Sequence, residues 1–310
     1  SWHMACVSDM TLGQTAYQLA NGRLWIEGMP PEAVSTIPTV PLGEVCKRIG
    51  PHHLDIAGAQ AKADGLPQGP FEVLAGAPLG AAYPCLWNHS AKDERHLTVL
   101  PDAHGRVREV AGRVPRELQE RAAARWATAS RAHYNLDVRF NSQSLIVAMT
   151  ERPCIGGRAW PSVILDNLEH EYALALWCNS TLGLLCHWWS ANPTQSGRGT
   201  TTVTGIPLVS TLDLSSLSSQ QHGMAKAVFE ALTDARLLPF DQIDEDPSRA
   251  ELDRRLLVDV LGLDACLCQP NGPLAILRQK LAAEPQIHGG KKTRVVFTAD
   301  GEESAERDDR

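Results

Sequence analysis

The sequence lacks the short motifs that mark several large enzyme classes. It has no glycine-rich dinucleotide fingerprint, no P-loop lysine motif, no G-x-S-x-G elbow and no H-E-x-x-H motif. These absences argue against a dinucleotide-dependent oxidoreductase, a P-loop nucleotidase, an α/β-hydrolase and a zincin protease. No nucleophile with an adjacent base stands out either, so the sequence gives no direct sign of catalysis.

Long apolar runs and secretion signals are also missing. The most apolar stretch, Tyr172–Trp189, is interrupted by the polar segment 179–181 and by His187, so no transmembrane helix is expected. The start, residues 1–4, looks like a remnant of an expression vector and is left out of the fold reasoning. The cysteines show no paired framework, which predicts reduced thiols and a cytoplasmic protein. They are Cys6, Cys46, Cys85, Cys154, Cys178, Cys186, Cys266 and Cys268.

The charge is distributed unevenly along an ordinary globular composition. The chain has 310 residues, of which 43% are apolar and 21% charged, with a net charge of −7. Residues 300–310 carry −4 and residues 241–264 carry −5, which leaves +2 for the rest. Segment 106–131 is rich in arginine. The contrast predicts two surfaces with different partners, although a solvated arginine face on a helix explains segment 106–131 equally well.

The pattern of residues predicts an α+β fold. We expect an N-terminal helix and linker at 1–30, a mixed, mostly-β domain with inserted helices at 31–215, a helical C-terminal region at 216–288 and a mobile tail at 289–310. Strands are expected at 71–74, 83–87, 96–100, 106–110, 136–140, 144–149, 162–165, 172–177 and 203–209, with a long loop at 150–160. Helices are expected at 12–26, 41–50, 115–131, 184–189, 218–233, 247–263 and 272–283.

Residues 139–202 have the composition of a surface that reads nucleic acid. Arginine forks bind phosphates or guanine edges, amide side chains pair with adenine, and hydroxyl groups donate to phosphates. Each loop alone is also typical of a polar surface turn, and the joint occurrence of these residues favours binding. We expect the loops at 139–144, 152–160 and 194–202 to converge on one cationic face. The candidate residues are Arg139, Asn141, Gln143, Arg152, Arg158, Asn179, Ser180, Gln195, Ser196, Arg198 and Thr200.

Segment 172–214 resembles a known family. The order is an apolar strand-like run, Asn179-Ser-x-x-Gly183 opening a helix, a polar loop at 195–199, and Leu212-Asp-Leu before another helix. It is similar to the target recognition domains of adenine-specific (N6) DNA methyltransferases and to specificity subunits of type I restriction systems, in restriction-modification and phage defence. The resemblance covers roughly residues 135–265 and implies a domain that binds double-stranded DNA.

The catalytic motifs of that family are absent from this chain. Its Asn/Asp-Pro-Pro-Tyr/Phe motif and glycine-bearing cofactor loop are missing, since Asn192-Pro193 is followed by a threonine. The resemblance therefore implies recognition without catalysis and without a cofactor, with S-adenosylmethionine bound only if a catalytic domain lies upstream. The chain would be part of a longer enzyme or a separate specificity subunit.

Two alternatives to DNA recognition remain open. The acidic helical region, residues 241–264, would dock on a methyltransferase or nuclease partner if the chain is a protein-interaction subunit. His52, His53 and Asp55 would hold a metal ion if the chain is an unrecognised metal-dependent enzyme. We place the metal-dependent enzyme last, because no second carboxylate cluster completes that set.

Overall fold

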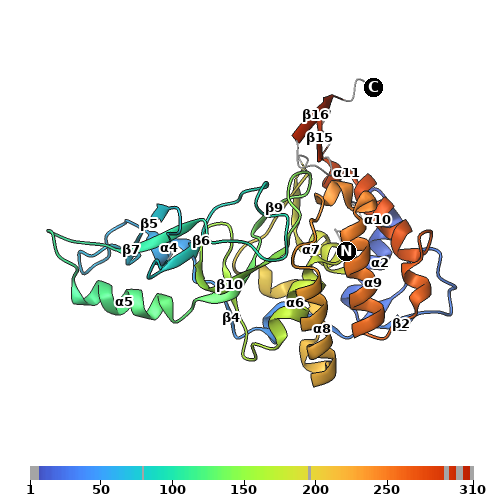
Figure 1. The fold of residues 1–310 in the computed structure, drawn as a ribbon, viewed down its shortest axis with the longest axis horizontal. Helices are drawn as coiled ribbons and strands as arrows, with labels where there is room; N and C mark the ends of the chain where they lie inside the picture. Colours follow the sequence, from blue (N-terminus) through green and yellow to red (C-terminus); the bar gives the residue numbers. More distant parts are fainter. Residues whose placement is uncertain (1–6, 79, 195–196, 290–292, 298–302, 308–310) are drawn as a thin grey trace.

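The computed structural model describes residues 7–78, 80–194, 197–289, 293–297 and 303–307. Figure 1 shows an elongated molecule with a smaller lobe at one end and a larger, helix-rich body at the other. Helices and strands are both abundant and are not arranged as regular alternating units, so the prediction of an α+β fold is confirmed.

A seven-stranded mixed sheet runs through both parts. Its order is β4-β11-β8-β10-β6-β7-β5, and β10 pairs antiparallel with β8 but parallel with β6. The long strand β10 therefore connects the larger body to the smaller lobe. The strands are β4 (Arg48–Ile49), β5 (Phe71–Ala75), β6 (Pro84–Leu86), β7 (Ala103–Val107), β8 (Ser130–Tyr134), β10 (Val147–Gly156) and β11 (Ser162–Ile164).

We define the small lobe as β5, β6 and β7 with helices α4 (His53–Ala57) and α5 (Arg116–Trp126) (Figure 1). Its core is a separate cluster of few buried apolar residues. The members are Ile56, Phe71, Cys85, Ala103, Ala122 and Ile155. Such a small cluster supplies little hydrophobic stabilisation, so other interactions have to hold the lobe together.

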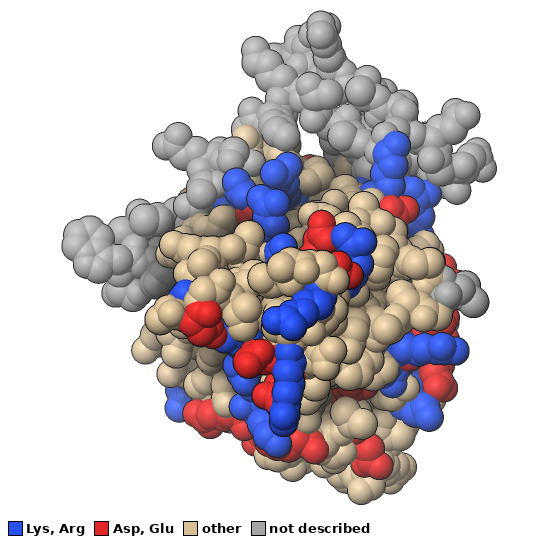
Figure 2. Space-filling view, turned by 90° about the vertical axis from the view of Figure 1, so that its left-hand side faces the viewer, with Lys and Arg blue, Asp and Glu red and all other residues tan. Residues whose placement is uncertain are grey.

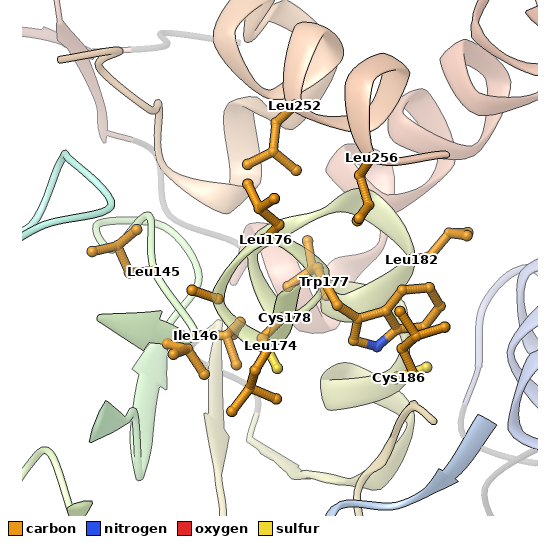
Figure 3. Close-up of a cluster of buried hydrophobic side chains, with 14 of the residues drawn as sticks. Leu145, Ile146, Leu174, Leu176, Trp177, Cys178, Leu182, Cys186, Leu252 and Leu256 are labelled. Carbon is orange, nitrogen blue, oxygen red and sulfur yellow. The ribbon is translucent and has the colours of Figure 1, made fainter. Parts of the chain in front are cut away.

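The main body is built around two consecutive buried helices, α6 (His170–Asn179) and α7 (Thr181–Ser190). Nearly every residue of both helices is buried, because β10, β14 and the C-terminal helices surround them. In Figure 3, Leu252 and Leu256 of the C-terminal helices lie above Leu176 of α6. The prediction of a strand at 172–177 is wrong, because a short apolar run without polar punctuation fits a helix buried on all sides equally well.

The remaining helices surround this centre. Glycine and proline mark several of their ends, and Asp9, Ser218 and Asp246 cap α2, α8 and α9 through their side chains. The helices are α2 (Met10–Ala20), α3 (Leu42–Val45), α8 (Ser219–Ala231), α9 (Pro247–Arg254), α10 (Pro273–Ala283) and α11 (Pro285–His288), with a π-helical turn at Arg255–Val260. The predicted helices at 218–233, 247–263 and 272–283 are thereby confirmed within a few residues, whereas the helix predicted at 115–131 ends earlier, at Trp126, and Ser130 already begins β8.

Small sheets complete the fold. They are β12 (Asn192–Thr194) with β13 (Arg198–Thr200) and β9 (Asp137–Arg139), then β1 (Arg23–Leu24) with β2 (Ser35–Thr36), β3 (Thr39–Pro41) with β14 (Ser210–Leu212), and β15 (Thr293–Phe297) with β16 (Glu303–Arg307). The predicted strand at 203–209 is wrong, since Pro207 lies in a short 3-10 helix, Ile206–Leu208. The predicted strand at 96–100 is wrong too, because only an isolated bridge, Thr98 to Met149, forms there.

Two expectations concern the chain ends. The predicted vector remnant, residues 1–4, lies outside the described residues, as do 290–292, 298–302 and 308–310 of the predicted mobile tail. Within that tail, β15 and β16 pair as an antiparallel hairpin, and its mobility stays a prediction. No helix in the described part of the chain combines the length and the apolar character that crossing a bilayer requires.

Candidate nucleic-acid interface

The three-stranded sheet β12-β13-β9 presents one face to solvent. Arg198 lies directly opposite Arg139, and Thr200 lies opposite Asp137. Because side chains alternate along a strand, these four share one face, while Val138 and its neighbours face inward. Val138 is fully buried, and Arg139 is exposed. The sheet therefore holds two arginines side by side on its outer face.

Asp137 fixes one of these two arginines. Two guanidinium nitrogens of Arg198, Nε and Nη2, donate to the two carboxylate oxygens of Asp137. These hydrogen bonds raise the pKa of Arg198, so the guanidinium group stays charged. A carboxylate that accepts from two guanidinium nitrogens holds the guanidinium plane in one orientation. Arg139 has no ion-pair partner among the described residues.

Gln143 positions this sheet from inside the protein. It is 3% exposed, and its Oε1 atom accepts hydrogen bonds from the Arg139 backbone N–H at 2.7 Å and from Asn135 Nδ2 at 3.2 Å. The prediction that Gln143 contacts a base is therefore wrong in this conformation. Its amide instead fixes where β9 ends and where Arg139 leaves the sheet.

Asn179 and Ser180 form the corner between the buried helices. Asn179 is fully buried, and its amide accepts from the Ile146 N–H at 2.8 Å and donates to the Val147 carbonyl at 2.6 Å. Ser180, also buried, caps α7 by accepting from the Gly183 N–H at 3.1 Å. A Cβ atom at Gly183 would lie 1.9 Å from the Trp177 carbonyl oxygen. The predicted DNA contacts of both residues are thus wrong, because this motif is the packing signature of a helix corner.

The other candidate residues lie in different places. Arg158 is exposed in the loop 157–160, and the Ala159 carbonyl in that loop accepts from the N–H of Leu136, just before β9. Arg152 is exposed at the bulge of β10, in the seven-stranded sheet, beside Thr150 and Arg131. Loop 157–160 therefore lies beside β9, and the convergence of Arg152 and Arg158 with the arginines of that sheet stays a prediction.

Three further candidates belong to the hairpin region. Gln195 and Ser196 lie outside the described residues. Thr200 is half-buried on the outer face of the sheet, and its hydroxyl donates to the Asn192 carbonyl at 3.4 Å. Asn141 is half-buried near Gly197, and its Nδ2 atom has no hydrogen-bond partner among the described residues. Thr200 remains placed to contact a ligand on this face, whereas the buried Nδ2 atom of Asn141 is not exposed to one.

A segment that the sequence did not point to, residues 88–102, lies against the same loops. Glu94 is 4% exposed and accepts from Trp160 Nε1 at 3.1 Å, two residues after Arg158. Arg95 donates from Nη1 to Ser144 Oγ at 2.8 Å, next to Gln143. We call the combined region the loop surface, made of segment 88–102, segment 139–144, loop 157–160 and the outer face of β12-β13-β9. In the sequence, segment 88–102 differs from its surroundings by a cluster of polar residues typical of turns.

Several arginines of segment 106–131 bind partners within the protein. Arg106 pairs with Glu72 at 2.5 Å, and Arg121 donates to the Pro67 carbonyl at 3.0 Å and to Asp64. Arg125 donates to the Asp55 carbonyl at 3.1 Å. Figure 2, which faces the small lobe, shows basic and acidic side chains interspersed. Several arginines of this segment are therefore engaged by acids or carbonyls within the lobe.

Acids of the C-terminal region are also engaged internally. Asp253 is fully buried and accepts from the Thr181 N–H and from Arg278, both at 2.8 Å. Asp246 is 2% exposed and caps α9, and the half-buried Glu251 binds Arg254 and Arg255 within the same helical segment. Asp253 thus joins the C-terminal helices to α7, whereas Asp244, Glu245 and Asp259 are exposed, and docking of a partner on residues 241–264 stays a prediction.

The metal-binding alternative finds no support in the described residues. No group of three or more His, Cys, Asp and Glu side chains lies close enough to hold a metal there. Asp55 accepts from Gln68 at 3.0 Å, while His52 caps α4. Cys154 Sγ lies 3.2 Å from His133 Nε2, but burial raises the pKa of the thiol to about 12 and lowers that of the imidazole to about 4. Both groups are neutral, which is unsuitable for a thiolate nucleophile.

Comparison with known proteins gives a likeness in fold. No protein-family profile and no curated protein sequence matches the chain. A solved structure, that of the type IIG restriction endonuclease BpuSI, superposes with a TM-score of 0.51 at 10% identity. The match covers 93% of this chain and 33% of that chain, so this chain spans about a third of the length of BpuSI. The fold is thus similar to part of a type IIG restriction endonuclease.

Proposed function

We propose that the chain is a non-catalytic DNA-recognition module of a restriction-modification or phage-defence system. The observation that carries this proposal is the cross-strand pair of Arg139 and Arg198 on the outer face of a small sheet. Asp137 holds Arg198 in one orientation, which a side chain that reads a base edge requires. Arg139 is available to a phosphate.

The fold likeness supports the same role. BpuSI is a restriction endonuclease, and the part that this chain matches is a third of it. A module of that kind needs no cofactor of its own, and S-adenosylmethionine would be bound by a separate catalytic domain. The partner of the module would be double-stranded DNA, together with the catalytic part of the system.

The experiment measures binding of a fluorescent duplex library by anisotropy, at several salt concentrations. Replacing Arg139 or Arg158 by alanine removes a phosphate contact, so the slope of log affinity against log salt should fall by about 1 for each. Arg116→Ala is the matched control, because Arg116 is exposed but lies on α5, away from the loop surface. The proposal fails if no duplex binds at low salt, or if all three variants behave alike.

Sequence selection from the library tests the reading role of Arg198. Arg198→Ala should relax the preference at a single position of the selected sequence and cost about 1–3 kcal/mol for the preferred duplex. Arg139→Ala should lower the affinity for all sequences by a similar factor. Equal loss of preference at every position in both variants would contradict the assignment of these two roles.

A further inference from the structure

A recess of about 510 Å³ opens within the loop surface. Segment 88–102 forms most of its wall, together with Leu86 at the end of β6. This volume is within the usual range for a small-molecule site and is ample for one nucleotide. None of the interactions assigned above to the DNA backbone uses it.

The lining of the recess favours a flat ligand that donates hydrogen bonds. Leu86 and Val99 are apolar and suit the faces of a ring. Asp93 adds carboxylate oxygens, which accept from amino groups, and Lys92 also lines the recess. The oxygens of Glu94 and Asp102 already accept hydrogen bonds from Ser90 and Trp160 and from Trp87 and Asn88. His96 also lines the recess, and its Nδ1 atom is buried with no hydrogen-bond partner in the described chain.

The loop that carries Arg158 lies beside the recess. The N–H groups of Gly157 and Ala159, on either side of Arg158, donate to the carbonyls of Leu86 and Trp87, both at 3.1 Å. Arg95 and Ser144, both buried, tie the segment to the interior of the body. Because Leu86 lines the recess, a phosphate held by Arg158 would leave its own base near the recess.

Leu100 is the most exposed large apolar side chain of the described residues, at 76% exposure, and it lies in the lining of this recess. Pro101 follows it and restricts the backbone. Exposed apolar side chains are inserted between base pairs by proteins that unstack DNA. A leucine at this position is suited to replace a base that has left the helix.

Resting on the function proposed above, we infer that the recess receives a single nucleobase with an exocyclic amino group, extruded from a duplex on the loop surface, while Leu100 occupies the space left behind. Carboxylate acceptors distinguish cytosine and adenine, which carry an amino group, from thymine, which does not. Asp93 is the best placed of the three acids, because it is exposed and only its Oδ2 atom has a contact, with Ser90 Oγ at 2.5 Å.

The test uses short duplexes with one unpaired extra base, since an unpaired base is extruded at the least cost. Binding of the full chain to duplexes with an extra cytosine, an extra thymine or no extra base is measured by anisotropy. The fluorescence of 2-aminopurine at the extra position reports unstacking. Leu100→Ala and Asp93→Asn are compared with Leu208→Ala, a control at 74% exposure in the 3-10 helix beside α3.

We expect the extra cytosine to bind roughly tenfold more tightly than the extra thymine, as one additional hydrogen-bonded contact would provide. Asp93→Asn should reduce this ratio toward one, Leu100→Ala should reduce the 2-aminopurine signal, and Leu208→Ala should change neither. Equal affinities for cytosine and thymine, with the perfect duplex still bound, would overturn the inference and leave the proposed function standing. Absence of binding to every duplex would overturn both.

Discussion

The small lobe and the loop surface both contain many arginines, but the arginines have different partners. In the small lobe, Arg106, Arg121 and Arg125 bind acids and backbone carbonyls from residues 55–72. On the loop surface, Arg139 and Arg158 are exposed and have no ion-pair partner among the described residues. The first group compensates for a small apolar core, and the second is available to a ligand.

The comparison teaches that the density of arginine along a sequence does not locate a binding surface. Segment 106–131 is the most arginine-rich part of the chain, yet its side chains are largely engaged in holding the lobe together. A guanidinium group that already binds a carbonyl and a carboxylate loses those bonds when it turns toward a phosphate. The partner of each arginine therefore decides its role.

The largest expected effect concerns Arg249. Like the arginines of the small lobe it has internal partners, but it is completely buried. It is fully buried, lies 3.4 Å from Asp246, and donates to the carbonyls of Ser144 at 2.9 Å and Asn179. Arg249→Ala should lower the free energy of unfolding by about 3–5 kcal/mol, because Asp246 is left buried with its charge uncompensated. Urea denaturation measures this loss.

Two further variants control that measurement. Arg249→Lys keeps the charge and should lose less stability than Arg249→Ala. Arg254→Ala removes a half-exposed arginine and should cost below about 1 kcal/mol. A loss for Arg249→Ala as small as that for Arg254→Ala would show that burial does not separate these arginines.

A smaller effect is expected in the small lobe. Arg121→Met keeps an aliphatic side chain but removes the hydrogen bonds to Pro67 and Asp64, and should cost about 1 kcal/mol. Amide hydrogen exchange should become faster in the small lobe and stay unchanged in the rest of the protein. Arg116→Met, at an exposed pair with Glu120, is the control and should be nearly neutral. If Arg121→Met abolished duplex binding without loss of stability, the division between the two regions would fail.

The smallest effect is a dependence on pH. The hydrogen bond from Arg254 lowers the pKa of Glu251 from 4.5 to about 2. Because the folded-state pKa is lowered, this stabilisation is complete above pH 4.5 and is lost as the pH falls toward 2. Glu251→Gln should therefore be less stable than the parent by a few tenths of a kcal/mol at neutral pH. The stabilities of the parent and the variant should become equal near pH 2. A difference in stability that grew as the pH fell would contradict the role given to the pair of Glu251 and Arg254.

Much of the fold follows from local patterns. Helices α5 and α8 have apolar stripes, α8 begins with a capping box, and the short strands β6, β9 and β11 alternate with turns. The prediction of a strand at 172–177 was wrong because a helix buried on all sides shows no amphipathic period. Strand β10 continues to Gly156 through exposed residues 151–153, which the sequence presents as loop.

The candidate site was predictable only in part, for a related reason. Arg139, Arg158 and Arg198 reach the loop surface, but Asn179 and Gln143 have the same residue types as base-reading groups and satisfy backbone groups instead. Sequence does not distinguish a polar side chain that serves the backbone from one that serves a ligand. The recess in segment 88–102 depends on contacts with Trp160 and Ser144, which are distant in the chain.

Gly199 has a consequence for engineering. A Cβ atom there would lie 2.6 Å from the Phe140 ring, so this position of β13 has to stay glycine. The positions on either side, 198 and 200, point outward, and their strand is paired through main-chain hydrogen bonds. A combinatorial library could thus diversify those two positions around a fixed glycine, and new target preferences could be selected without redesigning the interior.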